Sequence, residues 1–228
     1  MTLGPAPHDR LTHAQPQRIE ARNIELDERA RVRYERFRDR LRTKLGVRVA
    51  GDVLDIGCMD GRNTAAYAAE ARSVVGLDIA AHPAWEALAG ENLRYVEGDA
   101  QNLPFDDGTF DLVFATAMLH HTASPTRVLR EMVRVRRPRG TLVIVEPNRL
   151  NPLSWLHLTL LGEHDHFRTS DFIRLVDRVV PIKEFRRFEL HLWPTNDAAL
   201  RDRLERIEDA LDQSPLWQPF ILFNVAIA

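Results

Sequence analysis

Residues 53–64 read VLDIGCMDGRNT, and this stretch decides the fold class. The apolar run Asp52–Ile56 is typical of a strand, and the glycines that follow it, Gly57 and Gly61, predict a tight turn. A helical pattern begins at Arg62, so the amino terminus of a helix lies directly at that turn. Glycine lets the backbone approach a ligand closely, and a helix amino terminus offers unpaired N–H groups. The stretch therefore predicts a strand–turn–helix unit of an α/β protein that binds a ligand at the turn.

Short β-branched runs alternate with helical patterns along the rest of the chain, which favours βαβ units and a mostly parallel sheet. The expected strands are Asp52–Ile56, Ser73–Asp78, Leu93–Glu97, Phe110–Ala115, Thr141–Glu146, Phe185–Trp193 and Phe220–Ala226. The expected helices are Asp27–Leu45, Arg62–Ala71, Pro83–Leu88, Pro125–Arg136, a short apolar one from Pro152, Ser170–Val180 and Asp197–Asp212. Ser124 is expected as the N-cap of the helix that begins at Pro125.

The composition is that of an ordinary folded protein, with 44% hydrophobic and 28% charged residues and a net charge of −2. This balance gives no general attraction to nucleic acid or to an anionic membrane. The single cysteine excludes an intrachain disulfide and fits a reducing compartment. Residues 1–17 lack the apolar core of a signal peptide, and the longest apolar run is about half of the roughly 20 residues that cross a bilayer. We therefore expect a cytoplasmic protein with neither a nucleic-acid nor a membrane partner.

The second expected strand ends in Gly76-Leu77-Asp78, about twenty residues after the first turn. An acidic residue at this place can accept hydrogen bonds from both hydroxyls of a ribose. The interval between Gly57 and Gly61 does not match the G-x-G-x-x-G pattern, so support for a dinucleotide is weak. No G-K-[ST] sequence occurs, which excludes a P-loop.

Five segments in order resemble the motifs of class I, Rossmann-like S-adenosylmethionine-dependent methyltransferases, in the small-molecule group that includes quinone-biosynthesis methyltransferases. The segments are Val53–Thr64, Gly76–Ile79, Val96–Phe105, Phe110–Val113 with Leu119–His121, and Leu129–Leu142. The resemblance covers residues 51–148. It implies a three-layer, doubly wound α/β fold with a seven-stranded, mostly parallel sheet in the order 3-2-1-4-5-7-6, whose last strand is antiparallel. It also implies S-adenosylmethionine as cofactor and S-adenosylhomocysteine as product.

The resemblance assigns roles to individual residues. Asp55 and Gly57 would lie along the methionine part of the cofactor, and Asp78 would hold the ribose hydroxyls. Asp99 would accept from the adenine amino group, and Ala100 would offer its backbone N–H to the ring. The other residues placed around the cofactor are Cys58, Gly61, Ile79 and, facing the donor methyl group, Ala115.

Two residues depart from the family pattern. Met59 stands where the family has the middle glycine of the loop, and its side chain crowds the methionine part of the cofactor unless a negative φ turns it away. Arg139 replaces a glycine in the turn before the fifth strand, which predicts a different turn geometry there.

Histidines are the candidate general bases. His121 follows the fourth strand, where a histidine can take a proton from an acceptor hydroxyl, whereas His120 is expected to cap or pack. His164 and His166 belong to the segment that covers the acceptor in the family. Glu163-His164-Asp165-His166 matches no standard zinc spacing, so no metal is expected.

Taken together, these features predict methyl transfer to a small-molecule acceptor, with oxygen or nitrogen favoured, by an in-line displacement dominated by positioning. Residues 1–17 are expected as a flexible tail before a single domain, 18–228. That domain divides into a helical cap (18–50), a cofactor-binding core (51–148) and an acceptor-side cover (149–184), and acts as a monomer or homodimer. The alternative is a non-catalytic, S-adenosylmethionine-binding accessory or scaffold protein. A nucleic-acid methyltransferase is disfavoured by the charge and by the absence of an Asn/Asp-Pro-Pro-Tyr motif.

Overall fold

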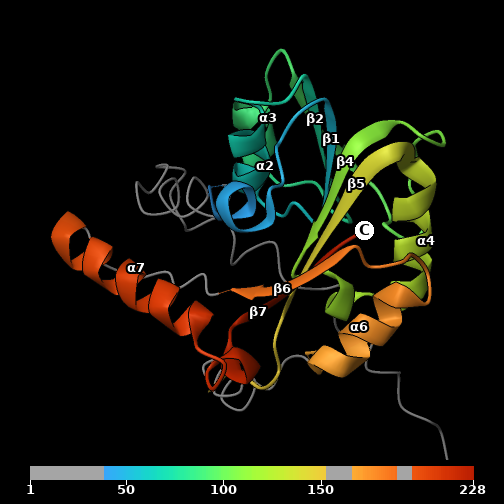
Figure 1. The fold of residues 1–228 in the computed structure, drawn as a ribbon. Coiled ribbons are helices and arrows are strands. Elements are labelled where there is room, and N and C mark those ends of the chain that lie inside the picture. Colours follow the sequence, from blue (N-terminus) through green and yellow to red (C-terminus); the bar gives the residue numbers. More distant parts are fainter. Residues whose placement is uncertain (1–38, 153–165, 189–196) are drawn as a thin grey trace, which may run out of the picture.

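The computed structural model describes residues 39–152, 166–188 and 197–228. One sheet of seven strands runs through it in the order β3-β2-β1-β4-β5-β7-β6, which confirms the expected order (Figure 1). Strands β1 to β5 pair in parallel, and β7 pairs antiparallel with both of its neighbours. The strands are β1 (Asp52–Ile56), β2 (Ser73–Asp78), β3 (Leu93–Glu97), β4 (Phe110–Thr116), β5 (Arg136–Pro147), β6 (Glu184–Phe188) and β7 (Phe223–Ile227).

Helices cover both faces of the sheet and complete three layers, as expected. In Figure 1, α2 and α3 lie on one face and α4 and α6 on the other, whereas α7 projects to one side. The α-helices are α2 (Arg62–Tyr67), α3 (Ala84–Leu88), α4 (Pro125–Val135), α6 (Thr169–Asp177) and α7 (Ala198–Gln213), and the 3-10 helices are η3 (Leu119–His121) and η4 (Gln218–Phe220). Within the described residues, no helix is long and apolar enough to cross a membrane.

The sheet has an apolar core on each face because side chains alternate along a strand. Leu142 and Ile144 pack in the cluster with α4 and α6, whereas Val143 and Val145 pack in the cluster of the opposite face. The continuous apolar runs of the sequence therefore are strands buried on both sides.

Several expected boundaries shift by a few residues. The helix from Arg62 ends at Tyr67 rather than Ala71, and β5 begins at Arg136 rather than Thr141. Ser124 is the N-cap of α4, but its side chain makes no capping hydrogen bond. Residues 39–45 form the end of the expected first helix. The expected tail, the rest of that helix, the apolar segment after Pro152 and the end of the strand expected to reach Trp193 lie outside the described residues.

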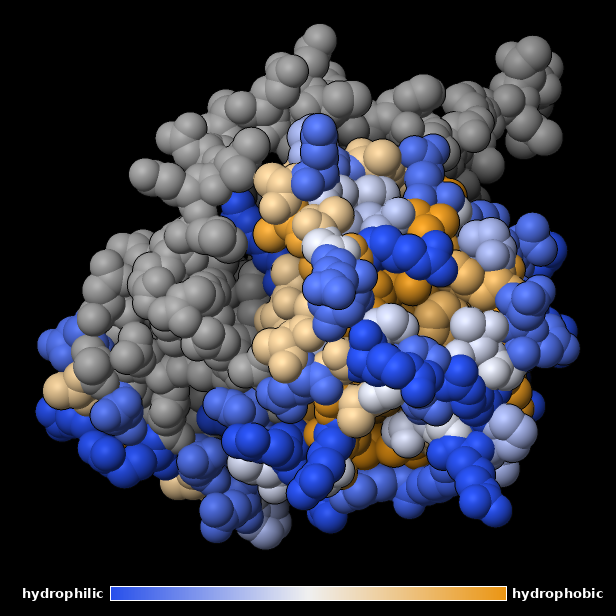
Figure 2. Space-filling model, turned by 90° about the horizontal axis from the view of Figure 1, so that it is seen from above, coloured by the Kyte–Doolittle hydropathy of each residue, from blue (hydrophilic) through white to orange (hydrophobic). Residues whose placement is uncertain are grey.

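An ion cluster at the amino ends of the central strands explains the longer β5. Arg137 contacts Asp52 at 2.9 Å and Asp111 at 2.5 Å, so that it joins β5 to β1 and β4. Arg72 also binds Asp52, and this contact holds the pKa of Asp52 well below its usual value. The pairing of β4 with β5 shifts register between Phe110 and Leu112, beside this cluster. Figure 2 views this end of the molecule and shows mainly hydrophilic residues, with smaller hydrophobic areas between them.

Gly140 provides a test of how tightly the start of β5 packs. A Cβ atom at Gly140 would lie 2.8 Å from the Asp111 carbonyl oxygen and 3.1 Å from that of Arg137, whereas a Cβ at Gly90 meets nothing within 4 Å. Gly140→Ala should therefore lower the free energy of unfolding by about 1–3 kcal/mol, and Gly90→Ala should leave it nearly unchanged. Urea unfolding followed by circular dichroism measures both. Equal stability of the two variants would contradict this packing.

Candidate cofactor and active site

The glycine loop after β1 requires its glycines. Gly57 has φ 76° and Gly61 has φ 80°, the left-handed region in which side chains are strained. A Cβ at Gly57 would also lie 2.7 Å from Met118 Cβ. The loop is held against β2 because the Gly57 N–H donates to the Leu77 carbonyl at 2.8 Å. The two glycines singled out by the sequence therefore have a structural reason in the turn itself.

Met59 has a left-handed backbone conformation, which glycine adopts without strain. Its φ is 48°, not negative, and this conformation costs a non-glycine residue roughly 1–2 kcal/mol. Its side chain is 75% exposed, and its carbonyl accepts a hydrogen bond from Trp85 Nε1 at 2.8 Å. The negative φ that would turn the side chain away from the cofactor is therefore not found, and the substitution also costs backbone strain.

Asp55 is a buried acid at the end of β1. Its side chain is almost fully buried, and its Oδ2 accepts from the Thr64 hydroxyl at 2.6 Å. Burial raises the pKa of Asp55 to about 7, and the charge of Asp78 adds to the rise while the bond from Thr64 opposes it. A buried acid with one hydroxyl partner is complementary to a cationic ligand group.

Asp78 links the end of β2 to the glycine loop. Its Oδ2 accepts from the Met59 N–H and its Oδ1 from the Ile79 N–H, both at 2.8 Å. Each carboxylate oxygen has a further lone pair, so the group can still accept from ligand hydroxyls. Ile79 beside it is 68% exposed and offers an apolar surface next to the carboxylate.

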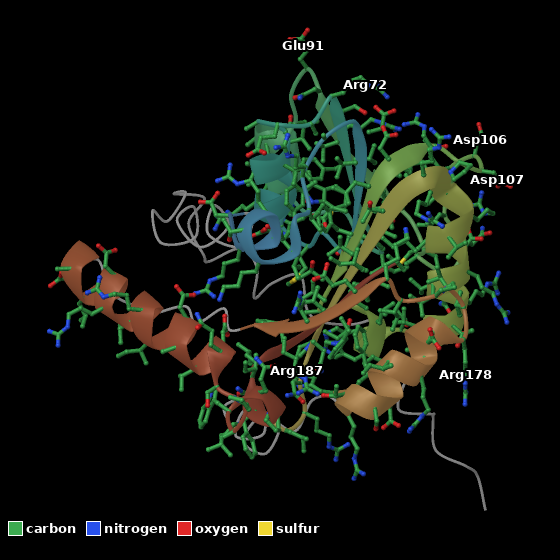
Figure 3. All side chains as sticks on the ribbon, viewed as in Figure 1. Arg72, Glu91, Asp106, Asp107, Arg178 and Arg187 are labelled. Carbon is green, nitrogen blue, oxygen red and sulfur yellow. The ribbon has the colours of Figure 1, made fainter. Side chains whose placement is uncertain are left out.

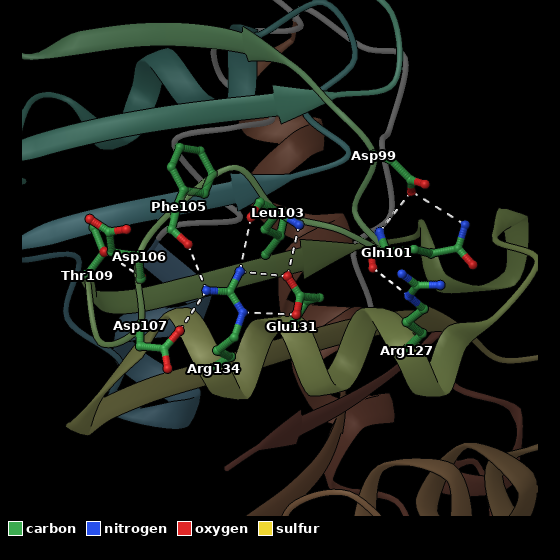
Figure 4. Close-up of polar contacts among 10 residues, drawn as sticks. All are labelled: Asp99, Gln101, Leu103, Phe105, Asp106, Asp107, Thr109, Arg127, Glu131 and Arg134. Atoms are coloured by element: carbon green, nitrogen blue, oxygen red, sulfur yellow. Dashed lines mark hydrogen bonds and ion pairs between the residues drawn. The ribbon is translucent and has the colours of Figure 1, made fainter.

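The loop after β3 carries the third acidic residue. Asp99 is exposed, and its Oδ1 accepts from the Gln101 N–H at 2.8 Å, whereas Ala100 is buried (Figure 4). Arg127 on α4 donates to the Gln101 carbonyl at 2.8 Å. The position of Asp99 is thus coupled to α4.

Arg134 anchors the rest of this loop to α4, as Figure 4 shows. Its guanidinium donates to the carbonyls of Leu103 at 3.0 Å and Phe105 at 2.7 Å and to the Asp107 carboxylate at 2.8 Å. Glu131, one turn earlier on the helix, accepts from two of its nitrogens. Sequence reasoning missed Arg134, although it lies in the fifth motif segment. The available signal was the spacing of Glu131 and Arg134, one turn apart on a helix that precedes a strand.

The structure pairs His120 with the carboxylate of Glu146. Glu146 at the end of β5 is fully buried, and its Oε2 lies 2.6 Å from His120 Nδ1. Its Oε1 accepts from the N–H groups of Met118 at 3.0 Å and Leu119 at 2.8 Å. A carboxylate oxygen only accepts, so this contact favours the tautomer in which Nδ1 of His120 carries the proton; in that neutral ring Nε2 has the lone pair.

The other candidate bases lie beside His120 or outside the described residues. The ring centroids of His121 and His166 are 4.0 Å and 4.8 Å from that of His120, and His121 is exposed. His164 lies outside the described residues, as does most of the 163–166 segment weighed as a metal ligand. In the described ranges, no group of three metal-type ligands is found.

Parallel pairing brings these groups to one edge of the sheet. Ile56 pairs with Leu77 on β2 and with Ala115 on β4, so that the residues after each strand lie at the same carboxyl edge. Ala115 itself is fully buried in the apolar core, and Cys58 is a buried thiol whose pKa is raised by burial. At this edge lie the glycine loop, the three acids Asp55, Asp78 and Asp99, and His120 with Glu146.

Asp55 makes the stability of the fold depend on pH. Because burial raises the pKa of Asp55 to about 7, the folded chain keeps this carboxyl protonated until close to neutral pH, whereas the unfolded chain releases the proton near 3.8. The free energy of unfolding should therefore fall as the pH rises from about 4 to about 7, by on the order of 3 kcal/mol from this group. Asp55→Asn keeps the acceptor for Thr64 and has no proton to lose.

Urea unfolding at pH 5 and pH 8 checks this expectation. The stability difference between Asp55→Asn and wild type should move in favour of the variant at pH 8, whereas Asp106→Asn, at an exposed acid, should follow wild type. A difference that does not change with pH would show that Asp55 is ionised in the folded chain.

Comparisons with known proteins agree with this geometry. The family described as "Methyltransferase domain" matches residues 54–144. The chain is 37% identical over 103 residues to a demethylmenaquinone methyltransferase of Clavibacter sepedonicus, a match that covers 43% of this chain and 42% of the relative. It is 32% identical over 167 residues to the ubiquinone biosynthesis O-methyltransferase of Serratia proteamaculans, covering 64% of this chain and 67% of the relative. The match to the first of these spans less than half of that relative.

Solved structures share the fold. The 1,6-didemethyltoxoflavin-N1-methyltransferase of Burkholderia thailandensis, solved with S-adenosylhomocysteine, superimposes with a TM-score of 0.64 at 18% identity, covering 100% of this chain and 92% of that one. An S-adenosylmethionine-dependent methyltransferase of Mesorhizobium loti gives 0.60 at 17% identity, with coverage of 81% and 94%. By sequence motifs, strand order and curated relatives, the chain belongs to the Rossmann-like family of S-adenosylmethionine-dependent methyltransferases.

Proposed function

We propose that the protein transfers a methyl group from S-adenosylmethionine to a small-molecule acceptor, at an oxygen or nitrogen atom. The observation that carries the proposal is the set of acids Asp55, Asp78 and Asp99 around a glycine loop at one sheet edge. Each acid suits a different part of the cofactor.

The residues at this edge fit the cofactor in charge and shape. The buried carboxyl of Asp55 would face the ammonium group, a cation that favours the ionised acid. Asp78 would accept from the ribose hydroxyls while it holds Met59 and Ile79. Asp99 and the Ala100 N–H would bind the adenine ring, whose face would cover the exposed Ile79 side chain. The cofactor, when bound, supplies a methyl group already activated on a sulfonium.

The contribution of the chain to the reaction would be mainly positioning. Holding donor and acceptor in line converts a bimolecular step into an intramolecular one. A hydroxyl acceptor also has to lose its proton, and Nε2 of His120 can accept it because Glu146 keeps the proton of the ring on Nδ1. In this proposal His120 takes the role that the sequence favoured for His121, and His121 and His166 enclose its ring.

The names of relatives support small-molecule acceptors. One is a ubiquinone biosynthesis O-methyltransferase and another, from Amycolatopsis mediterranei, a 27-O-demethylrifamycin SV methyltransferase. The structural neighbour from Burkholderia thailandensis methylates a ring nitrogen, by its name. The proposal extends to a single domain over residues 18–228 with its cofactor-binding core at 51–148. A non-catalytic role, the second candidate, rests on Met59 and its strained backbone.

Titration calorimetry with S-adenosylhomocysteine tests the cofactor site. We expect saturable binding by wild type and a loss of at least about tenfold in affinity for Asp78→Ala, since both ribose acceptors and the tie to Met59 disappear. Asp106→Ala, at an exposed acid of the opposite edge, is the matched control. Unchanged affinity of Asp78→Ala would remove Asp78 from the site.

Turnover separates the enzyme from the non-catalytic candidate. The protein is incubated with S-adenosylmethionine and pools of small phenols, hydroxy acids and amines, and S-adenosylhomocysteine is measured by mass spectrometry. Formation of S-adenosylhomocysteine that requires one of the acceptor pools supports the proposal. Binding without formation in any pool favours the scaffold role.

Glu146→Gln tests the role of His120. The glutamine oxygen can accept from Met118 and Leu119, but its amide then donates to Nδ1 and moves the ring proton to Nε2. Affinity for S-adenosylhomocysteine should stay unchanged, whereas kcat with a hydroxyl acceptor should fall by roughly a hundredfold. Nitrogen NMR of the histidine rings reports the tautomer without any acceptor. A variant whose His120 keeps its proton on Nδ1, or whose kcat is unchanged, would contradict this role.

A further inference from the structure

A cavity lies at the far edge of the sheet, away from the glycine loop. It has a volume of about 620 Å³ and is bounded by the end of the first helix, strand β6 and the end of α7. This volume is in the range of small-molecule sites in proteins. The lining side chains that matter here are Lys44, Phe185, Arg186, Arg187, Asp212 and Gln218.

The cavity is distinct from the cofactor site but opens at the same level of the sheet. Strand β6 is the edge strand, separated from β1 by β7, β5 and β4. Arg187 pairs with Asn224 on β7, and Asn224 pairs with Glu146 on β5. Two strand spacings put the backbone of Arg187 about 10 Å from that of Glu146. The residues that line the cavity include none of those described for the cofactor site.

Arg187 is the chemically notable group of the cavity (labelled in Figure 3). Its Nη1 donates to the Gln218 carbonyl at 3.0 Å, and its guanidinium carbon lies 5.6 Å from the centre of the Phe185 ring. Its Nε is buried and has no hydrogen-bond partner. Burial lowers the pKa of Arg187, and across residues 39–152, 166–188 and 197–228 no carboxylate forms an ion pair with it. A buried donor without an acceptor is costly, so this edge of the guanidinium is suited to a ligand.

The other charges of the cavity are already compensated. Lys44 binds Asp209 at 2.9 Å and also contacts Asp212. Arg186 binds Glu184 at 2.7 Å. What remains is one positive charge, on Arg187, beside an aromatic ring.

We propose that this cavity binds the carboxylate of a small organic anion through Arg187. Nε and Nη2 lie on one edge of the planar guanidinium and match the two oxygens of a carboxylate, and Nη1 is already occupied by Gln218. Phe185 provides an apolar wall for the body of the ligand. A phosphate dianion would need a second uncompensated cation, which the lining does not offer.

Titration of the full-length, nitrogen-15-labelled protein tests the site. The probes are benzoate, its neutral isostere benzamide, and inorganic phosphate, and the signals followed are the arginine Nε–H resonances and the backbone amides of β6. Benzoate should bind saturably and shift the Nε–H signal of Arg187, and benzamide should not. Arg187→Gln should weaken benzoate at least about tenfold. Arg186→Gln, at the neighbouring arginine that is paired with Glu184, is the matched control and should bind like wild type.

Arg187→Lys separates loss of binding from loss of folding. Lysine keeps the positive charge but lacks the two parallel N–H groups that match a carboxylate. This variant should also weaken benzoate, and its thermal unfolding should match that of wild type. Absence of saturable benzoate binding, equal binding by Arg187→Gln, or tighter binding of phosphate than of benzoate would overturn the proposal. S-adenosylhomocysteine binding is measured on the same samples. If the protein binds S-adenosylhomocysteine but not benzoate, only the anion-site proposal is contradicted. If it binds benzoate but not S-adenosylhomocysteine, only the proposed function is contradicted.

Discussion

Parallel pairing of β1 with β2 on one side and β4 on the other is the constraint on which the rest of the structure depends. The register of Ile56 with Leu77 and with Ala115 sets the carboxyl ends of three strands level with one another. The central strand β1 pairs with a neighbour on each side, so ligand contacts at this edge come mainly from residues at or just beyond the strand ends. The glycine loop, Asp78 and the 117–121 segment occupy those positions.

The site concentrates features that reduce stability. Asp55 is buried with a hydroxyl as its hydrogen-bond partner, and Met59 keeps a left-handed backbone in place of glycine. A turn that only connects a strand to a helix gains nothing from a buried acid or from a left-handed methionine. Both are understandable where a cationic ligand compensates the acid and where the backbone path matters more than the residue in it. The two cores above and below the sheet supply the stability that these residues cost.

Antiparallel β7 shapes the other half of the carboxyl edge. It lies between β5 and β6 and sets Glu146, Asn224 and Arg187 in one row across three strands. Glu146 is used within the chain, by His120 and two backbone N–H groups. Arg187, at the edge strand, donates to the Gln218 carbonyl but has no carboxylate partner among the described residues, so the two ends of the row differ in charge compensation.

The sequence by itself determined the fold class and the glycine loop with its acids, and these follow from local patterns: apolar runs of strand length, glycines at turns, and acids directly after strands. The strand order came from the resemblance of five motif segments to a known family, not from those patterns. Helix and strand ends were less well determined, as at Tyr67 and Arg136, because tertiary contacts such as the Asp52–Arg137 pair decide them.

Only the tertiary structure decided which histidine meets Glu146 and which arginine lacks a carboxylate among the described residues. His120 and His121 are neighbours in sequence and equal in type, yet Glu146 lies 26 residues away and reaches only the first. Arg186 and Arg187 are likewise adjacent and both line the cavity, but the first binds Glu184 whereas no carboxylate of the described residues binds the second. Alternating side-chain directions and contacts between distant segments make these choices, and a linear pattern does not contain them.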